Sequence, residues 1–227
     1  MTMPFYVPPE QLTKDRAEFA RKGIARGRPI IVIEYTDGVL LIGENPSGSL
    51  HKTSEIYDKV AFAGVGRFNE FEMLRVAGIR YADLKGYSYE REDVTAKGLA
   101  NAYAQTLGQI FTHEMKPYEI EVMIAEIGLE PADNKLYRVQ FDGTLRDIKR
   151  FGAMGGMEDE LTERLAQDLD DLPELGAAVR LAADTIEGVL ETTIDDEDWE
   201  AAILDRNLGR RKFRRLTPSE IGAARSQ

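Results

Sequence analysis

The stretch that decides the fold runs from residue 29 to residue 42 and reads PIIVIEYTDGVLLI. Its two apolar runs, 30–33 and 39–42, consist of Ile, Val and Leu, which predicts two buried strands. Asp37-Gly38 lies between them and is a strong signal for a tight hairpin turn. The stretch therefore predicts an antiparallel pair of strands.

The same order of elements then occurs twice along the chain. A polar loop at 44–49 is followed by a strand at 59–65 and by two helices, one from residue 68 to about 86 and one around 99–111. The second half predicts strands at 120–127, 136–141 and 151–154, helices at 157–171 and 174–190, and a last strand at 199–204. Two covered sheets with a helix pair outside each form a four-layer αββα sandwich. We therefore predict an α+β fold rather than a doubly wound α/β fold, which alternates one strand with one helix.

The ends of the chain differ from this core. Residues 8–26 predict a helix that begins at Pro8-Pro9, and its apolar stripe is thin, so we expect it to lie on another surface. A short helix is predicted after Thr217-Pro218. We expect one domain over 1–227, made of a leading segment (1–7), this N-terminal helix (8–26), the sandwich core (28–205) and a basic tail (206–227).

Composition narrows the function. The chain of 227 residues has a net charge of -11 and no cysteine, which argues against nucleic acid as a general partner and against disulfides or thiolate sites. Neither a signal peptide nor an apolar span is evident, so we expect a cytoplasmic protein that does not enter a membrane. Residues 10–28 are basic and residues 157–200 are acidic. These runs are solvated faces or, alternatively, faces that meet between copies.

No motif predicts a cofactor or a metal. Gly64-Val65-Gly66 follows a strand, but Asn69 stands where a dinucleotide fingerprint needs its third glycine, so a tight turn is the better interpretation. His51 and His113 lack a second ligand at helical spacing. The acidic run 195–198 lacks the spacing of a calcium loop, and a solvated loop is expected there.

One nucleophile has to be considered. The αββα sandwich is the fold of N-terminal nucleophile hydrolases, in which the first Thr, Ser or Cys begins the first core strand. Thr2 would become N-terminal if Met1 were removed, yet a helix and Pro29 separate it from that strand. At the strand the chain reads Arg28-Pro29-Ile30, without a hydroxyl or a thiol. The sequence thus predicts a hydrolase-like scaffold of N-terminal nucleophile type, with an added N-terminal helix and without catalytic residues.

Several longer motifs carry a family resemblance. Residues 20–28 (ARKGIARGR), 43–47 (GENPS), 54–59 (SEIYDK), 68–72 (FNEFE), 99–108 (LANAYAQTLG) and 116–119 (KPYE) resemble proteasome α subunits of the actinobacterial type. The resemblance is close over about 1–160, thins to about 205 and returns at 210–216. The resemblance implies a non-catalytic subunit in a homo-heptameric outer ring, stacked on β subunits that carry an N-terminal threonine.

The resemblance also implies particular site residues. Lys52 would pair with the carboxylate at the C-terminus of an activator tail, and Gly66 would lie at the neighbouring backbone contact; from the sequence alone Lys52 is an ordinary loop lysine. The resemblance implies that the activator is a proteasomal ATPase ring or an ATP-independent activator and that tagged protein substrates pass through the ring. The expected gate at the ring axis consists of Thr2, Met3, Pro4, Phe5, Tyr6, Val7 and Pro8.

Two features depart from the wider family. The Tyr-Asp-Arg signature of archaeal and eukaryotic α subunits is absent near the N-terminus, and the tail beyond Leu216 is short. A catalytic β-type threonine peptidase subunit and an unrelated cytosolic binding module remain as alternatives. A threonine that begins the first strand after processing would support the former, and a monomeric size would support the latter.

Overall fold

A computed structural model describes residues 8–169 and 171–226. Three short 3-10 helices, η1 (Arg91–Asp93), η2 (Pro131–Asp133) and η3 (Asp196–Asp198), lie in loops. The longer elements follow in the order α1 (Pro9–Ile24), β1 (Ile30–Tyr35), β2 (Gly38–Glu44), β3 (Thr53–Tyr57), β4 (Val60–Gly66), α2 (Phe68–Ser88), α3 (Ala96–His113), β5 (Ile120–Glu126), β6 (Lys135–Val139), β7 (Leu145–Ile148), β8 (Phe151–Met154), α4 (Glu158–Asp168), α5 (Leu175–Leu190), β9 (Trp199–Asp205), β10 (Phe213–Arg215) and α6 (Pro218–Arg225).

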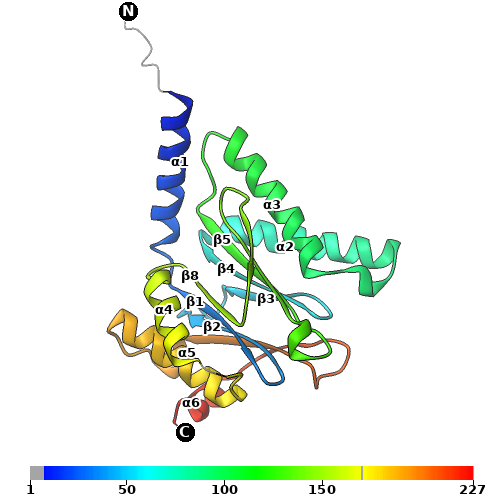
Figure 1. Cartoon of the computed structure of the whole chain (residues 1–227), viewed down its shortest axis with the longest axis vertical. Helices are drawn as coiled ribbons and strands as arrows, with labels where there is room; N and C mark the ends of the chain where they lie inside the picture. Colours follow the sequence, from blue (N-terminus) through cyan, green and yellow to red (C-terminus); the bar gives the residue numbers. More distant parts are fainter. Residues whose placement is uncertain (1–7, 170, 227) are drawn as a thin grey trace, which may run out of the picture.

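The strands form two five-stranded antiparallel sheets. The first sheet has the order β10-β9-β2-β1-β8, and the second has the order β3-β4-β5-β6-β7. Helices α4 and α5 cover the outer face of the first sheet, while α2 and α3 cover the second (Figure 1). The predicted αββα sandwich is therefore confirmed, with the helix pairs outside as expected.

The first strand shows why both sheets are covered. Ile31 and Ile33 pack with α4 and α5 in one outer core, whereas Ile30 and Val32 face the second sheet in the central core. Since successive side chains of a strand point to opposite faces, a run of four apolar residues contributes to two cores at once. The hairpin itself pairs Tyr35 with Gly38, so the turn lies where Asp37-Gly38 predicted it.

Three strands were not predicted from the sequence: β3, β7 and β10. All three lie at sheet edges, and each contains polar or charged residues. Edge strands of this kind protect a sheet against further pairing, and their mixed composition hides the strand pattern. The predicted helix at 157–171 is also shorter in the structure, where α4 ends at Asp168.

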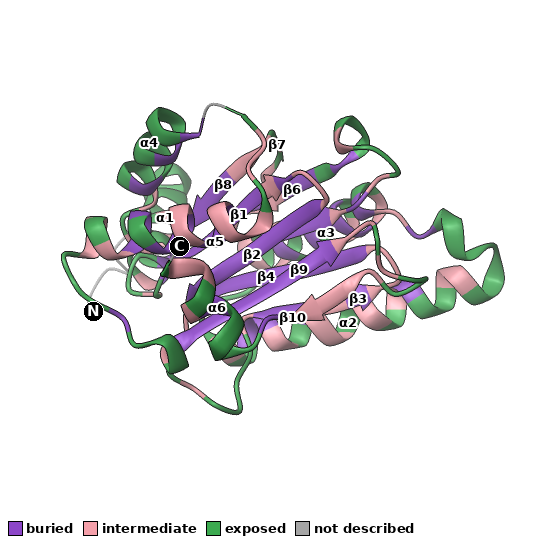
Figure 2. Cartoon of the chain, turned by 90° about the horizontal axis from the view of Figure 1, so that it is seen from below, coloured by how far each residue is buried: buried purple, intermediate pink, exposed green. Residues whose placement is uncertain are grey.

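Helix α1 differs from the rest of the chain in its packing. Only Ala20 and Ile24 are buried, in a small cluster with Phe141, while Leu12 and Phe19 are about half exposed. Figure 1 shows α1 projecting from the sandwich, and Figure 2 shows the inner strands mostly buried while the helices mix buried, intermediate and exposed residues. The N-terminal helix predicted over 8–26 thus extends from Pro9 to Ile24. Its residues 9–15 are exposed, and its contacts with α3 begin at Arg16, whose Nη2 donates to Ile110 O at 3.4 Å.

Candidate functional site

The site lies where the chain enters β1, which is the place a nucleophile would occupy in a hydrolase of this fold. Pro29 stands directly before β1, and the segment ahead of it turns back from α1. The Gly27 nitrogen donates to Ile24 O at 2.8 Å, and its carbonyl oxygen accepts from Gly156 N at 2.9 Å. These two hydrogen bonds hold the turn, and Arg28 and Pro29 follow it directly before β1.

A pocket of about 240 Å³ opens beside this turn. It joins the segment before β1, the loop after β2 and the corner between β4 and α2. Its walls are formed by Gly27, Arg28, Asn45, Pro46, Ser47, Leu50, Lys52, Gly64, Val65, Gly66, Phe68 and Phe71. The structure thus brings Lys52 and Gly66 into one pocket, which has a partly apolar lining and one lysine.

Lys52 is fixed at both its main chain and its side chain. Its nitrogen donates to Glu200 Oε2 at 3.0 Å, its carbonyl oxygen accepts from Gly64 N at 2.9 Å, and its Nζ donates to Arg28 O at 3.0 Å. Burial lowers the pKa of Lys52 to about 8, Arg28 adds to this lowering, and Glu200 and Glu44 oppose it. A cation partly stripped of water attracts a carboxylate that can enter the pocket.

Gly66 has a backbone that an L side chain rarely adopts. Its φ is +111°, and a Cβ built on it would lie 1.9 Å from Glu119 O. The neighbouring Arg67 nitrogen donates to the same oxygen at 3.1 Å, which ties the β4–α2 corner to the start of β5. Glycine is therefore required here for the turn, as predicted.

A second group of residues supports the pocket and was not predicted. The Glu200 carboxylate, on β9, accepts hydrogen bonds from the loop that carries Lys52, and Asn45 and Arg215 belong to the same network. A lone acidic residue in the otherwise apolar run 199–204 was the only signal for it in the sequence.

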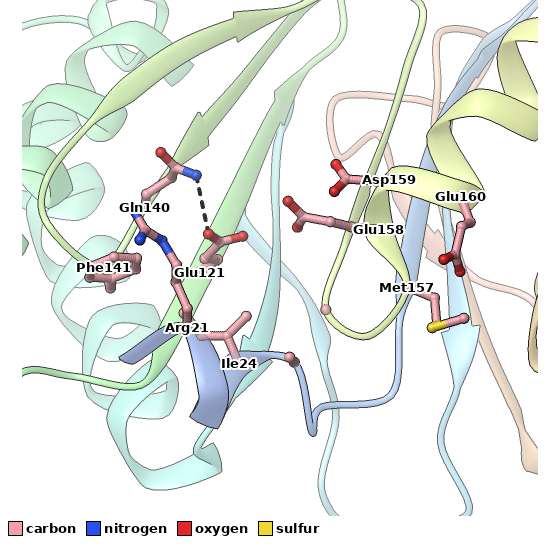
Figure 3. A pocket seen from close by; sticks show the side chains of 11 residues that line it. Arg21, Ile24, Glu121, Gln140, Phe141, Met157, Glu158, Asp159 and Glu160 are labelled. Carbon is pink, nitrogen blue, oxygen red and sulfur yellow. Dashed lines mark hydrogen bonds between the residues drawn. The ribbon is translucent and has the colours of Figure 1, made fainter. Parts of the chain in front are cut away.

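A separate pocket of about 290 Å³ lies between the end of α1, the second sheet and the start of α4 (Figure 3). Beside it Arg138 Nη2 donates to Glu121 Oε2 and to Glu158 Oε2, each at 2.5 Å. Burial raises the pKa of Glu121, although the Arg138 guanidinium acts in the opposite direction. Glu158 and Asp159 also lie at the N-terminus of α4, where carboxylates are favourable. The ion pairs with Arg138 and the N-terminus of α4 therefore account for the carboxylates around this pocket.

The remaining candidates are distributed over the molecule. His51 lies near Glu200 of the first sheet, whereas His113 is the last residue of α3. Asp196 pairs with Arg225, and no cluster of metal-ligating side chains occurs among residues 8–169 and 171–226. Of the predicted gate residues, Thr2 to Val7 lie outside the described residues, and Pro8 is exposed at the start of α1.

Comparison with known proteins gives consistent results. The family model described as "Proteasome subunit" matches residues 24–204. Three relatives carry the name "Proteasome subunit alpha". The chain is 52% identical to the one from Thermomonospora curvata, with 97% of this chain and 96% of the relative covered. It is 55% identical to the one from Xylanimonas cellulosilytica (95% and 93% covered) and 52% identical to the one from an Arthrobacter species (100% and 99% covered).

Proposed function

Because the chain belongs to the proteasome subunit family, we propose that it is a non-catalytic α-type subunit of a bacterial proteasome core particle. In this role it forms the outer ring, admits substrates to the chamber of the β subunits and docks the tails of an activator. The observation that carries the proposal is the pocket at the entry to β1, where Arg28 stands in place of a nucleophile and Lys52 faces the cavity.

The absence of catalysis is argued from the path of the chain. A threonine peptidase of this fold needs a free α-amino group at the first residue of the first strand. Here α1 and the turn at 25–29 precede β1, and Gly27 is held by Ile24 and Gly156. A catalytic β-type subunit is therefore the weaker alternative, because none of Arg28, Pro29 and Ile30 carries a hydroxyl or a thiol.

Docking of an activator tail is argued from the chemistry of the pocket. The C-terminal carboxylate of a peptide needs a cation when it leaves water, and Lys52 supplies one at a fixed position. Leu50, Phe68 and Phe71 line the same pocket and suit an apolar residue near the end of the tail. We assign Gly66 to the main-chain contact beside the carboxylate, because it lines the same pocket as Lys52.

Ring formation is argued from α1. A helix of this length is marginal in water unless a surface covers it, and only its last turns are covered within the chain. We propose that α1 packs between neighbouring copies in a homo-heptameric ring, which stacks on β subunits. The residues ahead of it, 2–8, then form the gate through which tagged protein substrates enter.

The cellular setting follows from the same proposal. Within the part of the chain that the structure describes, no helix has both the length and the apolar character to span a bilayer. We propose a cytoplasmic location, where a proteasomal ATPase ring or an ATP-independent activator would meet the outer ring. The chemistry of the pocket suits the tail of either activator.

Electron microscopy of this chain, co-expressed with the β-type subunit from the same source, tests the proposal. Sevenfold barrels with this chain in both outer rings are expected. A monomer that does not associate with the β subunit would contradict the proposal and would favour an unrelated binding module. Barrels that contain this chain in the inner rings would favour the β-type alternative.

A further inference from the structure

The carboxylate of Glu200 is the common acceptor of the loop that carries Lys52. Glu200 lies on β9, opposite Gly43 of β2, and 9% of its surface is exposed. Its oxygens accept from Asn45 Nδ2 at 2.5 Å, from the main-chain nitrogens of Lys52 and Thr53 at 3.0 and 2.9 Å, and from Thr53 Oγ1 at 2.5 Å. Arg215 Nη1 adds a fifth hydrogen bond at 2.9 Å.

So many donors on one buried carboxylate imply that it is ionised. Burial alone favours the neutral acid, but the hydrogen bonds from Thr53, Lys52 and Asn45 lower the pKa of Glu200 below its usual value. Removing a carboxylate that satisfies several donors leaves each donor without a partner, which is costly in a buried site. Glu200 therefore carries a permanent negative charge directly behind the pocket.

Hydrogen bonds to Glu200 hold both ends of the loop between β2 and β3. Asn45 stands at its beginning and also donates to Leu50 O at 2.6 Å, while Lys52 and Thr53 stand at its end. Because Glu200 binds both ends, the loop cannot shift without breaking hydrogen bonds to a buried charge. Arg215 fixes the same corner from β10, since its Nη2 donates to Thr53 O at 2.7 Å.

Charged groups from several elements act electrostatically on the Lys52 ammonium. Arg28 comes from the segment before β1 and pairs with Glu44 at the end of β2, at 3.3 Å. Glu200 comes from β9, where Arg215 of β10 and the His51 ring, 3.8 Å from its Oε2, both approach it. Glu200 is thus the buried anion among these groups: it pairs with Arg215 and accepts from the main-chain nitrogen of Lys52, and its charge acts on the Lys52 ammonium without a direct ion pair.

We propose that Glu200 is the positioning residue for docking at this pocket: it holds the loop that carries Lys52 and supplies the negative charge that balances the Lys52 ammonium. This inference rests on the proposed function, because it assigns a second residue to the same docking pocket. Glu200 does not touch the docked tail and acts through Lys52. The sign of the pH dependence distinguishes this role from general stabilisation of the fold.

The test uses the assembled particle and a ten-residue peptide copied from the C-terminus of the proteasomal ATPase of the same source. The peptide carries a fluorescent label at its N-terminus and is prepared with a free or an amidated C-terminus. Fluorescence anisotropy gives the affinity of both forms between pH 6.5 and pH 9.5. For the unchanged particle we expect the free acid to bind at least about tenfold more tightly than the amide at pH 7, with the preference falling as the pH rises through about 8.

Glu200→Gln keeps the shape of the side chain and removes its charge. Without that charge the Lys52 ammonium loses its proton more easily, so we expect the preference for the free acid to fall at a pH about one unit lower. Arg215→Gln removes the cation that pairs with Glu200, so the negative charge of Glu200 acts more strongly on Lys52. We expect the preference for the free acid to fall at a higher pH in this variant. Thr53→Val removes the two hydrogen bonds of the Thr53 hydroxyl, which donates to Glu200 and accepts from Arg215, without changing charge, so affinity falls while the midpoint stays in place.

The outcomes separate the two proposals. If the unchanged particle does not prefer the free acid, or if Lys52→Ala does not abolish the preference, docking at Lys52 is wrong. If that preference depends on Lys52 but neither Glu200→Gln nor Arg215→Gln moves the midpoint, only the role of Glu200 is wrong. Should Glu200→Gln not assemble, the upward shift with Arg215→Gln decides the question by itself.

Discussion

The ammonium nitrogen of Lys52 lies 3.0 Å from the carbonyl oxygen of Arg28, although the residues are 24 positions apart. The contact joins the loop after β2 to the segment that enters β1. A carbonyl oxygen accepts one of the three hydrogens of the ammonium group and leaves the others for a ligand. The Lys52 side chain is therefore already ordered without a ligand, which reduces the conformational entropy that binding would cost.

Replacing Lys52 tests the docking pocket in function. We expect Lys52→Ala to leave the ring intact but to weaken activator-dependent degradation of a folded substrate at least about tenfold, because the tail carboxylate loses its cation. Lys149→Ala is the matched control, since this lysine is exposed on the turn before β8. Degradation of the folded substrate at the unchanged rate in the presence of the ATPase would contradict the assignment.

Removal of residues 1–7 tests the proposed gate. The truncated chain still begins α1 at Pro9, so the ring should form, and we expect several-fold faster hydrolysis of a short fluorogenic peptide without an activator. A variant with residues 2–7 replaced by Gly and Ser distinguishes the effect of sequence from that of length. If the rate does not rise, the gate lies elsewhere or is already open at rest.

Gly66 offers a prediction about stability. Gly66→Ala places a Cβ 1.9 Å from Glu119 O at a φ of +111°, so the β4–α2 corner has to move. We expect a loss of about 3 kcal/mol in the free energy of unfolding, or a fall in Tm of roughly 6–12 °C. Gly209→Ala is the control, because its added Cβ meets nothing within 4 Å. Equal melting temperatures for the two variants in calorimetry would refute the argument.

The charged group beside the second pocket predicts a pH-dependent defect. Arg138→Met leaves the buried Glu121 without its cation, which costs about 3–5 kcal/mol when the carboxylate is ionised. The pKa of Glu121 is already raised by burial, so protonation relieves the cost as the pH falls. Urea denaturation should therefore show a larger loss of stability at pH 8 than at pH 5.

The control for this experiment comes from the neighbouring strand. Arg146 lies opposite Arg138 in the β6–β7 pair but is exposed. Arg146→Met should change the free energy of unfolding by less than about 0.5 kcal/mol at either pH. A defect of Arg138→Met that is the same at pH 5 and pH 8 would mean that Glu121 is not the cause.

Most of the fold could be predicted because its inner strands are continuous apolar runs, as in 30–33 and 39–42. The edge strands could not be found in this way. In β10, Phe213-Arg214-Arg215 is part of a basic stretch, and only its pairing with β9 makes it a strand. The same holds for β3, where a register shift near Tyr57 further weakens the alternating pattern.

The site was predictable to a smaller extent. Lys52 and Gly66 were named through a family resemblance, and the structure places both in one pocket. Asn45 and Glu200 are 155 positions apart, so their hydrogen bond follows only from the pairing of β2 with β9. The contact of Arg215 with Glu200 could not be predicted either, because the strand that carries Arg215 was not predicted.

The sparse packing of α1 has a consequence for when this helix becomes ordered during assembly. With only Ala20 and Ile24 buried, the first turns of this helix gain little from the chain that carries them. Amide hydrogens there should exchange rapidly in a free subunit and slowly once neighbours have arrived. If the proposed ring and gate are right, the first turns of α1 become ordered only when the ring is complete, so an incomplete ring would have neither an ordered entrance nor an ordered docking surface for an activator.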